Sequence, residues 1–423
     1  MKNISTPTNQ NIANKAILVR VDYNVPLKKV NGKMTVVEPE RIEDSIPTIK
    51  FLLKNNCRVI LMSHLGRPSG KVVKKLSLKP VADYLKTEFN FPVLFSSKTV
   101  GAEVEKKAKA LEPGQILLLE NLRFHAEEKK NDKEFAQQLA KLADAYINDA
   151  FSTSHRAHAS ISSVPKFLPA FAGFHIMQEI AHLADLMKNP KHPFVMIIGG
   201  AKISDKVEAV QNLCQYADLV LVGGGVANNF LKAGGLETHK SYLEEKPGDK
   251  SREGNNYVKV ASNLIEENKT ERILKDGYIP LPKLLFPTDV IAAENKDSKK
   301  TEVVDLSRGM KDTPDDKDLM YLDIGPKTIK LYKELILQAE TIFWNGPMGV
   351  FEKEQFSQGT KEIARAIAKS AAYTVIGGGD TIAAIKKFTK EDRFDYVSSA
   401  GGASLAFLAG KKLPGLEAVK KSG

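Results

Sequence analysis

A run of three glycines followed by an acidic residue and a threonine is the stretch of this sequence best suited to bind an anion. Residues 373–376 are apolar and partly β-branched, which predicts a short buried strand. Glycines at 377–379 follow, then Asp380 and Thr381, then apolar residues at helical spacing. A glycine loop lets the backbone approach a phosphate closely, and the N–H groups of the first helical turn point toward it.

Asp380 has two possible roles in this motif. It is either the N-cap of the helix, a position that Asp commonly occupies, or the partner of a metal ion on the bound phosphate. Taken by itself, the motif favours the N-cap.

The strand-then-glycine pattern occurs twice more in the second half of the chain. Residues 194–198 run into a Gly-Gly pair and residues 219–222 into three glycines, and a fourth glycine-rich turn lies at 397–404. One such loop would be only a tight turn, but several indicate an open α/β sheet with its loops at one edge, where ligands bind. Lys202 and Lys206 are four residues apart, and we expect them to share a face at a helix start and to reach phosphates.

Basic side chains recur on four successive predicted strands or loops of the first half. They are Arg41, Arg67, Arg123 and Arg156, with His64 and His155 nearby. A single arginine is typical of a solvated face, but several at one sheet edge would bind a ligand with carboxylate and phosphate groups, because guanidinium binds both bidentately. Each histidine is either a scaffold residue or a proton carrier. The His and Cys residues show no metal-ligand spacing.

These groups must be positioned by more than one domain. At 423 residues the chain is too long for one ordinary core, so we expect two or three domains. A helix predicted at 177–191 separates the two α/β halves and suits a lever between them. Another helix is predicted to open at Arg41 and continue through Leu53. The heavily charged residues 239–318 suit an exposed part of the second domain.

Composition narrows the function classes. The formal net charge of +11 suits an anionic ligand or nucleic acid, but the basic residues are scattered, so attraction to acidic small molecules is the inference. Cys57 and Cys214 fit buried thiols in a reducing compartment. The N-terminus lacks the apolar segment of a signal peptide, and no apolar run approaches a membrane span. We therefore expect a cytoplasmic protein with no membrane partner.

A set of motifs spread in order over almost the whole chain resembles the phosphoglycerate kinase family. The motifs are residues 20–26, 63–68, 120–124, 155–158, 199–202, 323–327, 344–352 and 377–381. Any one of them could occur by chance, but the ordered set is specific. The resemblance implies an α/β fold of two similar-sized Rossmann-like domains, each a mainly parallel sheet flanked by helices, joined by a hinge helix.

The resemblance also implies a glycolytic kinase. It would transfer a phosphoryl group reversibly from the C1 acyl phosphate of 1,3-bisphosphoglycerate to ADP with Mg²⁺, giving 3-phosphoglycerate and ATP, as hinge closure brings two half-sites together. Residues 1–187 would bind 3-phosphoglycerate or 1,3-bisphosphoglycerate, residues 188–406 would bind the Mg-nucleotide, and residues 407–423 would pack back on the N-terminal domain. The implied protein is a monomer that binds no nucleic acid.

Site residues follow from the same resemblance. The implied substrate-binding residues are Asp22, Tyr23, Asn24, Arg41, His64, Leu65, Gly66, Arg67, Arg123 and Arg156. The implied nucleotide-binding residues are Lys202, Lys206, Gly224, Gly325, Asn345, Pro347, Glu352, Gly378, Gly379, Asp380 and Thr381. The implied catalytic residues are Arg41, Lys202, Lys206, Gly378 and Gly402, and Asp380 would hold Mg²⁺ with the nucleotide phosphates. Phosphoryl transfer needs positioning and charge neutralisation more than a base, which suits such a set.

Three positions depart from the family's usual pattern. Tyr23 stands where Phe is usual, and Ser152 and Ala400 stand where glycine is usual. The change at Ala400 matters if the backbone there needs a positive φ, which only glycine adopts readily.

Competing function classes fit less well. An NAD-dependent dehydrogenase also has glycine loops after strands, but the chain contains no G-x-G-x-x-G. A P-loop kinase is excluded because no G-x-x-x-x-G-K-[ST] occurs. A basic nucleic-acid-binding protein is suggested only by the net charge, and no matching module is present.

Overall fold

The chain divides into two compact units. The computed structural model describes residues 4–244, 257–269, 271–274, 277–307 and 318–420. The first unit is Met1–Ala181 with Lys412–Gly423, and the second is His182–Lys411. The predicted boundary after residue 187 lies C-terminal to the division after Ala181. The tail predicted to begin at residue 407 starts before the division at Lys412. Residues 245–256, 270, 275–276 and 308–317 of the predicted charged region lie outside the described residues.

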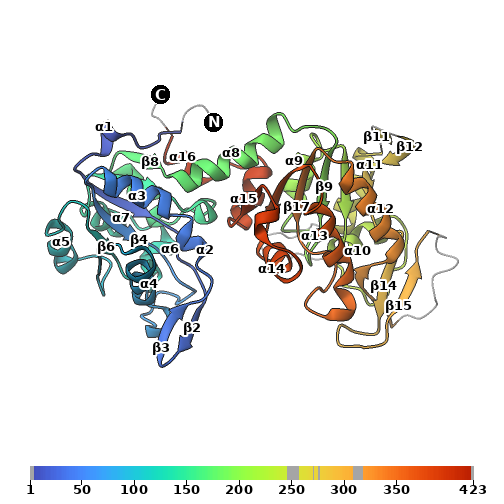
Figure 1. The fold of residues 1–423 in the computed structure, drawn as a ribbon, viewed down its shortest axis with the longest axis horizontal. Helices are drawn as coiled ribbons and strands as arrows, with labels where there is room; N and C mark the ends of the chain where they lie inside the picture. Colours follow the sequence, from blue (N-terminus) through green and yellow to red (C-terminus); the bar gives the residue numbers. More distant parts are fainter. Residues whose placement is uncertain (1–3, 245–256, 270, 275–276, 308–317, 421–423) are drawn as a thin grey trace. The chain divides into compact units, whose positions relative to one another are not determined.

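The first unit contains a six-stranded parallel sheet (Figure 1). Its strands lie in the order β5-β6-β4-β1-β7-β8. Its strands are β1 (Ala16–Arg20), β4 (Arg58–Met62), β5 (Val93–Phe95), β6 (Ile116–Leu118), β7 (Ala145–Asn148) and β8 (Ala170–Ala172). The strand order reverses at β1, which pairs with β4 on one side and β7 on the other. Ligand sites of such sheets lie beyond the carboxyl ends of the strands at this point.

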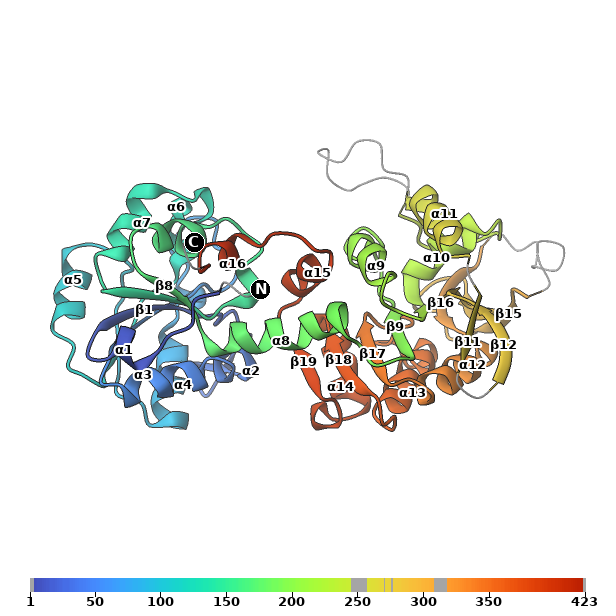
Figure 2. The same cartoon turned by 90° about the horizontal axis from the view of Figure 1, so that it is seen from above.

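Helices cover both faces of this sheet, which explains why its strands are continuous apolar runs. Figure 2 shows α3 and α4 on one face and α6 and α7 on the other. The helices are α1 (Asn9–Ile12), α2 (Glu40–Glu43), α3 (Ile46–Lys54), α4 (Lys79–Phe89), α5 (Ala102–Lys109), α6 (Ala126–Lys130), α7 (Lys133–Ala140) and α16 (Pro414–Glu417). Strands β2 (Leu27–Val30) and β3 (Lys33–Val36) form a separate antiparallel hairpin.

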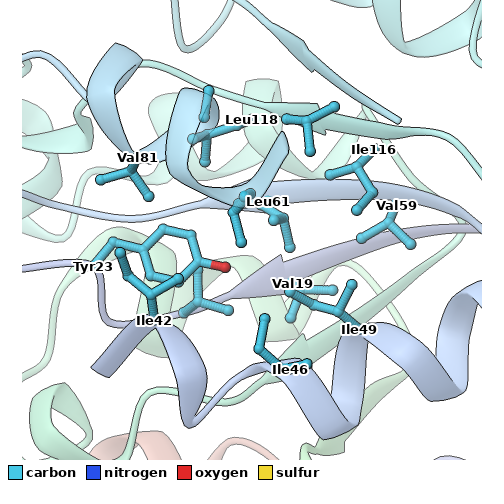
Figure 3. Packing of buried hydrophobic residues seen from close by; sticks show 14 of the residues in the cluster. Val19, Tyr23, Ile42, Ile46, Ile49, Val59, Leu61, Val81, Ile116 and Leu118 are labelled. Carbon is cyan, nitrogen blue, oxygen red and sulfur yellow. The ribbon is translucent and has the colours of Figure 1, made fainter. Parts of the chain in front are cut away.

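The core of the first unit lies between the sheet and α3 and α4. Val19, Val59 and Leu61 from the central strands meet Ile49 and Val81 from the helices, all fully buried (Figure 3). Burying one such side chain stabilises the fold by roughly 1.5–3 kcal/mol. The core therefore fixes the strand ends from which the site residues project.

The single helix predicted from Arg41 through Leu53 is wrong. The segment forms two helices, α2 and α3, and residues 44–45 separate them. Pro47 has no N–H to donate back to the Glu43 carbonyl, and it lies in the first turn of α3, where no such bond is needed. Arg41 therefore stands on its own short turn.

The C-terminal tail belongs to the first unit. Gly415 N–H donates to the Ser154 carbonyl at 2.9 Å, and Asn148 Nδ2 donates to the Gly415 carbonyl at 3.2 Å. A side chain on Gly415 would overlap Ser154, so only glycine permits this approach. Ile4 and Lys420 pair in an antiparallel bridge, which joins the two ends of the chain.

The second unit contains another six-stranded parallel sheet, in the order β13-β10-β9-β17-β18-β19. Its strands are β9 (Phe194–Ile198), β10 (Leu219–Val222), β13 (Leu284–Leu285), β17 (Thr341–Asn345), β18 (Tyr373–Gly377) and β19 (Tyr396–Ser398). The order reverses at β9, which pairs with β10 and β17. A smaller antiparallel sheet is formed by β14 (Asp289–Ala293), β15 (Glu302–Asp305) and β16 (Met320–Ile324), and β11 (Glu271–Leu274) pairs with β12 (Gly277–Pro282).

Helices follow the strands of the second unit as an open α/β sheet requires. They are α9 (Val207–Leu213), α10 (Gly224–Ala233), α11 (Tyr257–Glu267), α12 (Pro326–Leu337), α13 (Gln358–Ile367), α14 (Gly379–Phe388) and α15 (Gly402–Leu408). The connecting helix α8 (Phe174–Lys188) begins three residues before its predicted start at Met177. None of the described helices is long and apolar enough to cross a bilayer. The predicted two-domain α/β fold is confirmed.

Candidate active site

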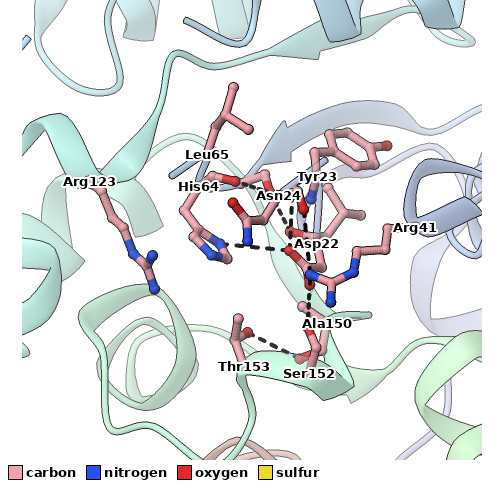
Figure 4. Close-up of polar contacts among 12 residues, drawn as sticks. Asp22, Tyr23, Asn24, Arg41, His64, Leu65, Arg123, Ala150, Ser152 and Thr153 are labelled. Carbon is pink, nitrogen blue, oxygen red and sulfur yellow. Dashed lines mark hydrogen bonds and ion pairs between the residues drawn. The ribbon is translucent and has the colours of Figure 1, made fainter. Parts of the chain in front are cut away.

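Asp22 is the centre of a polar cluster in the first unit. It lies just beyond β1 and is almost fully buried. Its Oδ2 accepts a hydrogen bond from Arg41 Nη1 at 3.0 Å and another from the Ser152 hydroxyl, and its Oδ1 lies 3.9 Å from His64 Nδ1 (Figure 4). Burial opposes ionisation, but the charge of Arg41, the Ser152 hydroxyl and the charge of Arg20 outweigh it and hold the pKa of Asp22 below its ordinary value. The carboxylate is therefore anionic.

His64 is a neutral acceptor in this cluster. Arg20 Nη2 lies 3.1 Å from its Nδ1, and because a guanidinium can only donate, Nδ1 accepts. Burial lowers the pKa of His64 well below its ordinary range; Asp22 opposes this effect, and Arg20, Arg123 and Arg156 add to it. His64 therefore cannot act as a cation at neutral pH.

Arg20 is a site residue that the sequence reasoning missed. It is fully buried, and its Nε donates to Ser160 Oγ at 3.0 Å. Ser160 Oγ in turn donates to Glu128 Oε1 at 2.6 Å. A charged residue at the end of an apolar strand was the available signal. The buried partner Glu128 lies on a distant helix, and no local pattern indicates it.

Arg123 carries a positive charge that nearby Glu128 and Asp22 balance only in part. Its Nη1 donates to the Gly66 carbonyl at 2.8 Å, and its buried Nε has no partner among the described residues. Burial, together with repulsion from Arg20 and Arg156, lowers the pKa of Arg123 to about 10. An anion bound here would relieve both the repulsion and the missing hydrogen bond.

Several predicted substrate residues shape the site from within the protein. Tyr23 is fully buried, and its hydroxyl lies 3.0 Å from Ser45 Oγ, so the departure from Phe is satisfied inside the core. Asn24 Oδ1 accepts the Gly66 N–H at 2.8 Å. Leu65 is buried, and its N–H donates to Asn121 Oδ1 at 3.2 Å. These contacts fix the loop after β4.

Two predicted arginines lie at the exposed rim. Arg67 is exposed, and the described part of the chain offers it no hydrogen bond or ion pair. Arg156 is also exposed, and its Nε donates to His155 Nε2 at 3.0 Å. Arg156 raises the positive potential around His64 and Arg123, whereas no described contact links Arg67 to them.

The second unit has a cavity of about 270 Å³ at the ends of β9, β10 and β17. Two glycine loops and the loop after β17 meet there: Gly200 N–H donates to the Pro347 carbonyl at 2.7 Å and Gly224 N–H to the Met348 carbonyl at 2.9 Å. Gly224 has φ +60°, and a Cβ on it would lie 2.8 Å from the backbone of Gly200. The glycines are therefore needed for close packing as well as for an open cavity.

Apolar side chains form part of the cavity lining, and a buried carboxyl group lies among them. Val290, Met320 and Leu322 line the cavity together with Asp323. The Asp323 carboxyl group accepts the Gly359 N–H at 2.8 Å and the Ile324 N–H at 3.0 Å. Burial nevertheless raises the pKa of Asp323 to about 8, so this group is largely protonated at neutral pH.

The N-cap interpretation of Asp380 is wrong. The N-cap of α14 is Gly378, with φ +96°, and Asp380 lies in the first turn of the helix. Its side chain is exposed and lines the cavity. A glycine was free to take the unusual backbone angle, which left the acidic side chain facing the site.

Thr381 in the first turn of α14 and Asn345 at the end of β17 are both buried near Gly378. Thr381 is buried, and its Oγ1 accepts the Gly346 N–H at 2.7 Å, so its hydroxyl holds the loop after β17. Asn345 Nδ2 is buried with no partner among the described residues, and it lies beside Gly378. This buried donor is therefore left without a hydrogen bond inside the described part of the protein.

The prediction that Lys202 and Lys206 share a face of one helix is also wrong. Helix α9 begins at Val207, with Lys206 as its N-cap, and Lys202 lies in the irregular loop before it. Lys202 is exposed and Lys206 half-buried. Burial lowers the pKa of Lys206, opposed by nearby acidic groups that include Asp380.

The remaining predicted residues have varied surroundings. Gly325 packs against Asp289, and a Cβ there would come within 2.3 Å of that carboxylate. Glu352 is exposed and lines the cavity. A Cβ on Gly379 or Gly402 would meet nothing within 4 Å.

The departure at Ala400 has no backbone consequence. The positive φ of this turn, +55°, falls on Gly401, which is the N-cap of α15. Ala400 is buried and keeps an ordinary backbone angle.

Comparison with known proteins agrees with the motifs. The family model described as phosphoglycerate kinase matches residues 8–411. Curated phosphoglycerate kinases from Moorella thermoacetica and Finegoldia magna are 46% and 44% identical, covering 96% and 99% of this chain and of each relative. The solved phosphoglycerate kinase of Coxiella burnetii is 38% identical with a TM-score of 0.79, covering 98% of both chains. These matches cover nearly the full length of the chain and of its relatives, so the chain belongs to the phosphoglycerate kinase family.

Proposed function

We infer that this chain catalyses the reversible transfer of a phosphoryl group from the C1 acyl phosphate of 1,3-bisphosphoglycerate to ADP, giving 3-phosphoglycerate and ATP in glycolysis and gluconeogenesis. Family membership supports the reaction. The observation that carries the assignment of sites is the pair of prepared anion sites, one in each unit. The site in the first unit is the clearer of the two, because the charge on Arg123 is balanced only in part and its Nε has no partner among the described residues.

We propose that the first unit binds the phosphorylated acid. Arg123 and Arg156 would hold its phosphate and carboxylate oxygens, and Arg41 would face the phosphoryl group that moves. Asp22 and His64 orient these groups: Asp22 pairs with Arg41 at 3.0 Å, and neutral His64 accepts from Arg20. Asn24, Leu65 and Gly66 fix the loop that carries the rim residue Arg67.

The second unit would bind the nucleotide. The apolar wall formed by Val290, Met320 and Leu322 suits a flat base, and the glycine loops suit the phosphates. Exposed Glu352 would accept hydrogen bonds from ribose hydroxyls. Lys202 would face the moving phosphoryl group, and we propose that hinge bending at α8 brings the two ligands together during turnover.

Mg²⁺ would be held by Asp380 together with nucleotide phosphates. Among the described residues, no group of three or more His, Cys, Asp or Glu could hold a metal alone. A single exposed carboxylate at the cavity edge nevertheless fits Mg²⁺, which binds one or two carboxylates plus substrate phosphates. The ion would neutralise charge on the phosphates.

We also propose a monomer in the cytoplasm that binds no nucleic acid. Cys57 and Cys214 are both free and buried, as in a reducing compartment. Burial raises the pKa of both thiols to about 11, which makes them inert.

The function is tested by mixing folded protein with ADP, Mg²⁺ and 1,3-bisphosphoglycerate and measuring ATP. We expect ATP only when all three are present. Absence of ATP with protein whose melting curve is cooperative would overturn the proposal, and salt-sensitive binding to generic DNA would favour the nucleic-acid alternative.

A further inference from the structure

The loop that carries Lys202 and Lys206 is anchored at one point by a buried carboxylate. Glu244 has only 6% of its surface exposed. Its Oε2 accepts the Ser204 N–H at 3.0 Å, and its Oε1 accepts the Ser204 hydroxyl at 2.6 Å. Both donors of one loop residue are thus held by the two oxygens of one side chain.

The segment that presents Glu244 is itself fixed by α10. Asn228 Nδ2 donates to the Tyr242 carbonyl at 3.1 Å, and Asn229 Nδ2 donates to the Glu244 carbonyl at 3.4 Å. Both asparagines are buried. The carboxylate therefore stands on an irregular segment that two side chains of α10 hold in place.

Helix α10 also holds the first end of the same loop. It begins at the second glycine loop, and Val226 N–H donates to the Gly200 carbonyl at 3.1 Å. The loop of residues 199–206 is consequently fastened to α10 directly at Gly200 and through Glu244 at Ser204. Lys202 lies between these two attachments.

We propose that Glu244 is a positioning residue for phosphoryl transfer, acting through Ser204 to hold the loop that places Lys202. The proposal rests on the proposed function of Lys202. A lysine that must meet a moving phosphoryl group needs a fixed backbone, because small misplacements of catalytic groups reduce rate more than binding. Glu244 also lies close enough to Lys206 to favour its charged form.

Ser204→Ala is the first test, because it removes one donor from a half-exposed position without adding bulk. We expect kcat to fall about tenfold, the lower range for a hydrogen bond to a charged group, with the nucleotide KM little changed. Ser204→Thr keeps the hydroxyl and should restore most of kcat. Glu244→Gln should lower kcat as well, because its amide nitrogen cannot accept from Ser204.

A double-mutant cycle separates positioning from plain stability. If Ser204 acts through Lys202, then Ser204→Ala should have no further effect on kcat in a Lys202→Ala background. Ser307→Ala is the matched control, since its N–H and hydroxyl both donate to Asp305, at 3.0 and 2.5 Å, away from the cavity. That control should keep full activity.

The outcomes distinguish this proposal from the function of the site. Intact kcat in Lys202→Ala would overturn the role of the lysine. Impaired Lys202→Ala combined with a neutral Ser204→Ala, or with an additive double mutant, would overturn the role of Glu244 alone. If Glu244→Gln fails to fold, the Ser204 variants still decide.

Discussion

The carboxylate of Asp22 lies 3.0 Å from Arg41 Nη1, and the Ser152 hydroxyl donates to the same carboxylate oxygen. Because Asp22 stays ionised far below neutral pH, it orients the guanidinium at all working pH values. The Arg41 side chain remains 35% exposed, which leaves it accessible to an arriving anion. Ser152, where glycine is usual, adds a donor to this arrangement.

Arg41→Ala should lower kcat by roughly a hundredfold or more, about 3 kcal/mol, because fixed cations aimed at a moving phosphoryl group act on the transition state. Arg41→Lys should recover only part of this loss, since an ammonium lacks the planar fork of guanidinium. Steady-state rates with 1,3-bisphosphoglycerate check both. The exposed Arg365, paired with Glu362 on α13, supplies a control in Arg365→Ala, which should be silent. A normal kcat in Arg41→Ala would refute the assignment.

Asp380→Asn should keep the melting temperature of the wild type, because Gly378 and not Asp380 caps α14. Activity should fall, and the Mg²⁺ concentration that gives half the maximal rate should rise about tenfold or more, by analogy with weakened metal shells. A titration of rate against Mg²⁺ measures this. Asp392→Asn, at another exposed carboxylate of the second unit, is the control. Lost stability with an unchanged Mg²⁺ response would show a structural role instead.

The fold was predictable because its signals are local. Apolar runs such as residues 194–198 and the glycines after them indicate buried parallel strands and tight loops without knowledge of the rest of the chain. The errors occurred where local signals conflict. Asp is a common N-cap, yet Gly378 took that position because only glycine adopts φ +96° without strain.

The candidate site was predictable only where polar residues follow strands. Asp22 and Arg123 follow strands and could be named from sequence, but their environments depend on pairs that are distant along the chain. Arg20 reaches Glu128 through Ser160, and no periodicity links those positions. The raised pKa of Asp323 arises from burial, which only the packed structure reveals.

Asp149→Asn should change the pH dependence of stability. Burial raises the pKa of Asp149 from 3.8 to about 6, although His175 and Thr48 oppose it. Between those values the folded protein holds a proton that the unfolded chain releases, so wild-type stability falls as pH rises through this window. Asn does not ionise, and its carbonyl oxygen can still accept the hydrogen bond from the backbone N–H of His175, which is 3.0 Å long in the wild type.

The Asp149→Asn variant should therefore not lose stability as the pH rises through this window. Above pH 6 its free energy of unfolding should exceed that of the wild type by at most about 3 kcal/mol, because each pKa unit corresponds to roughly 1.4 kcal/mol. Urea unfolding at a series of pH values from 4 to 7.5 measures the difference. Parallel curves for the two proteins would show that Asp149 titrates normally.

Lys202→Ala should lower kcat far more than it raises KM for either substrate. Lys202 is exposed in the loop before α9, so its ammonium can meet a phosphoryl group whose negative charge spreads in the transition state. Losing one such partner should reduce the rate by roughly a hundredfold, about 3 kcal/mol. Nucleotide binding should persist, because the glycine loops and the apolar wall are unchanged. Calorimetric titration with ADP and steady-state kinetics separate the two effects, with the exposed Lys330→Ala on α12 as control. If Lys202→Ala instead raises the nucleotide KM and leaves kcat intact, Lys202 is a binding contact and the transition-state role is wrong.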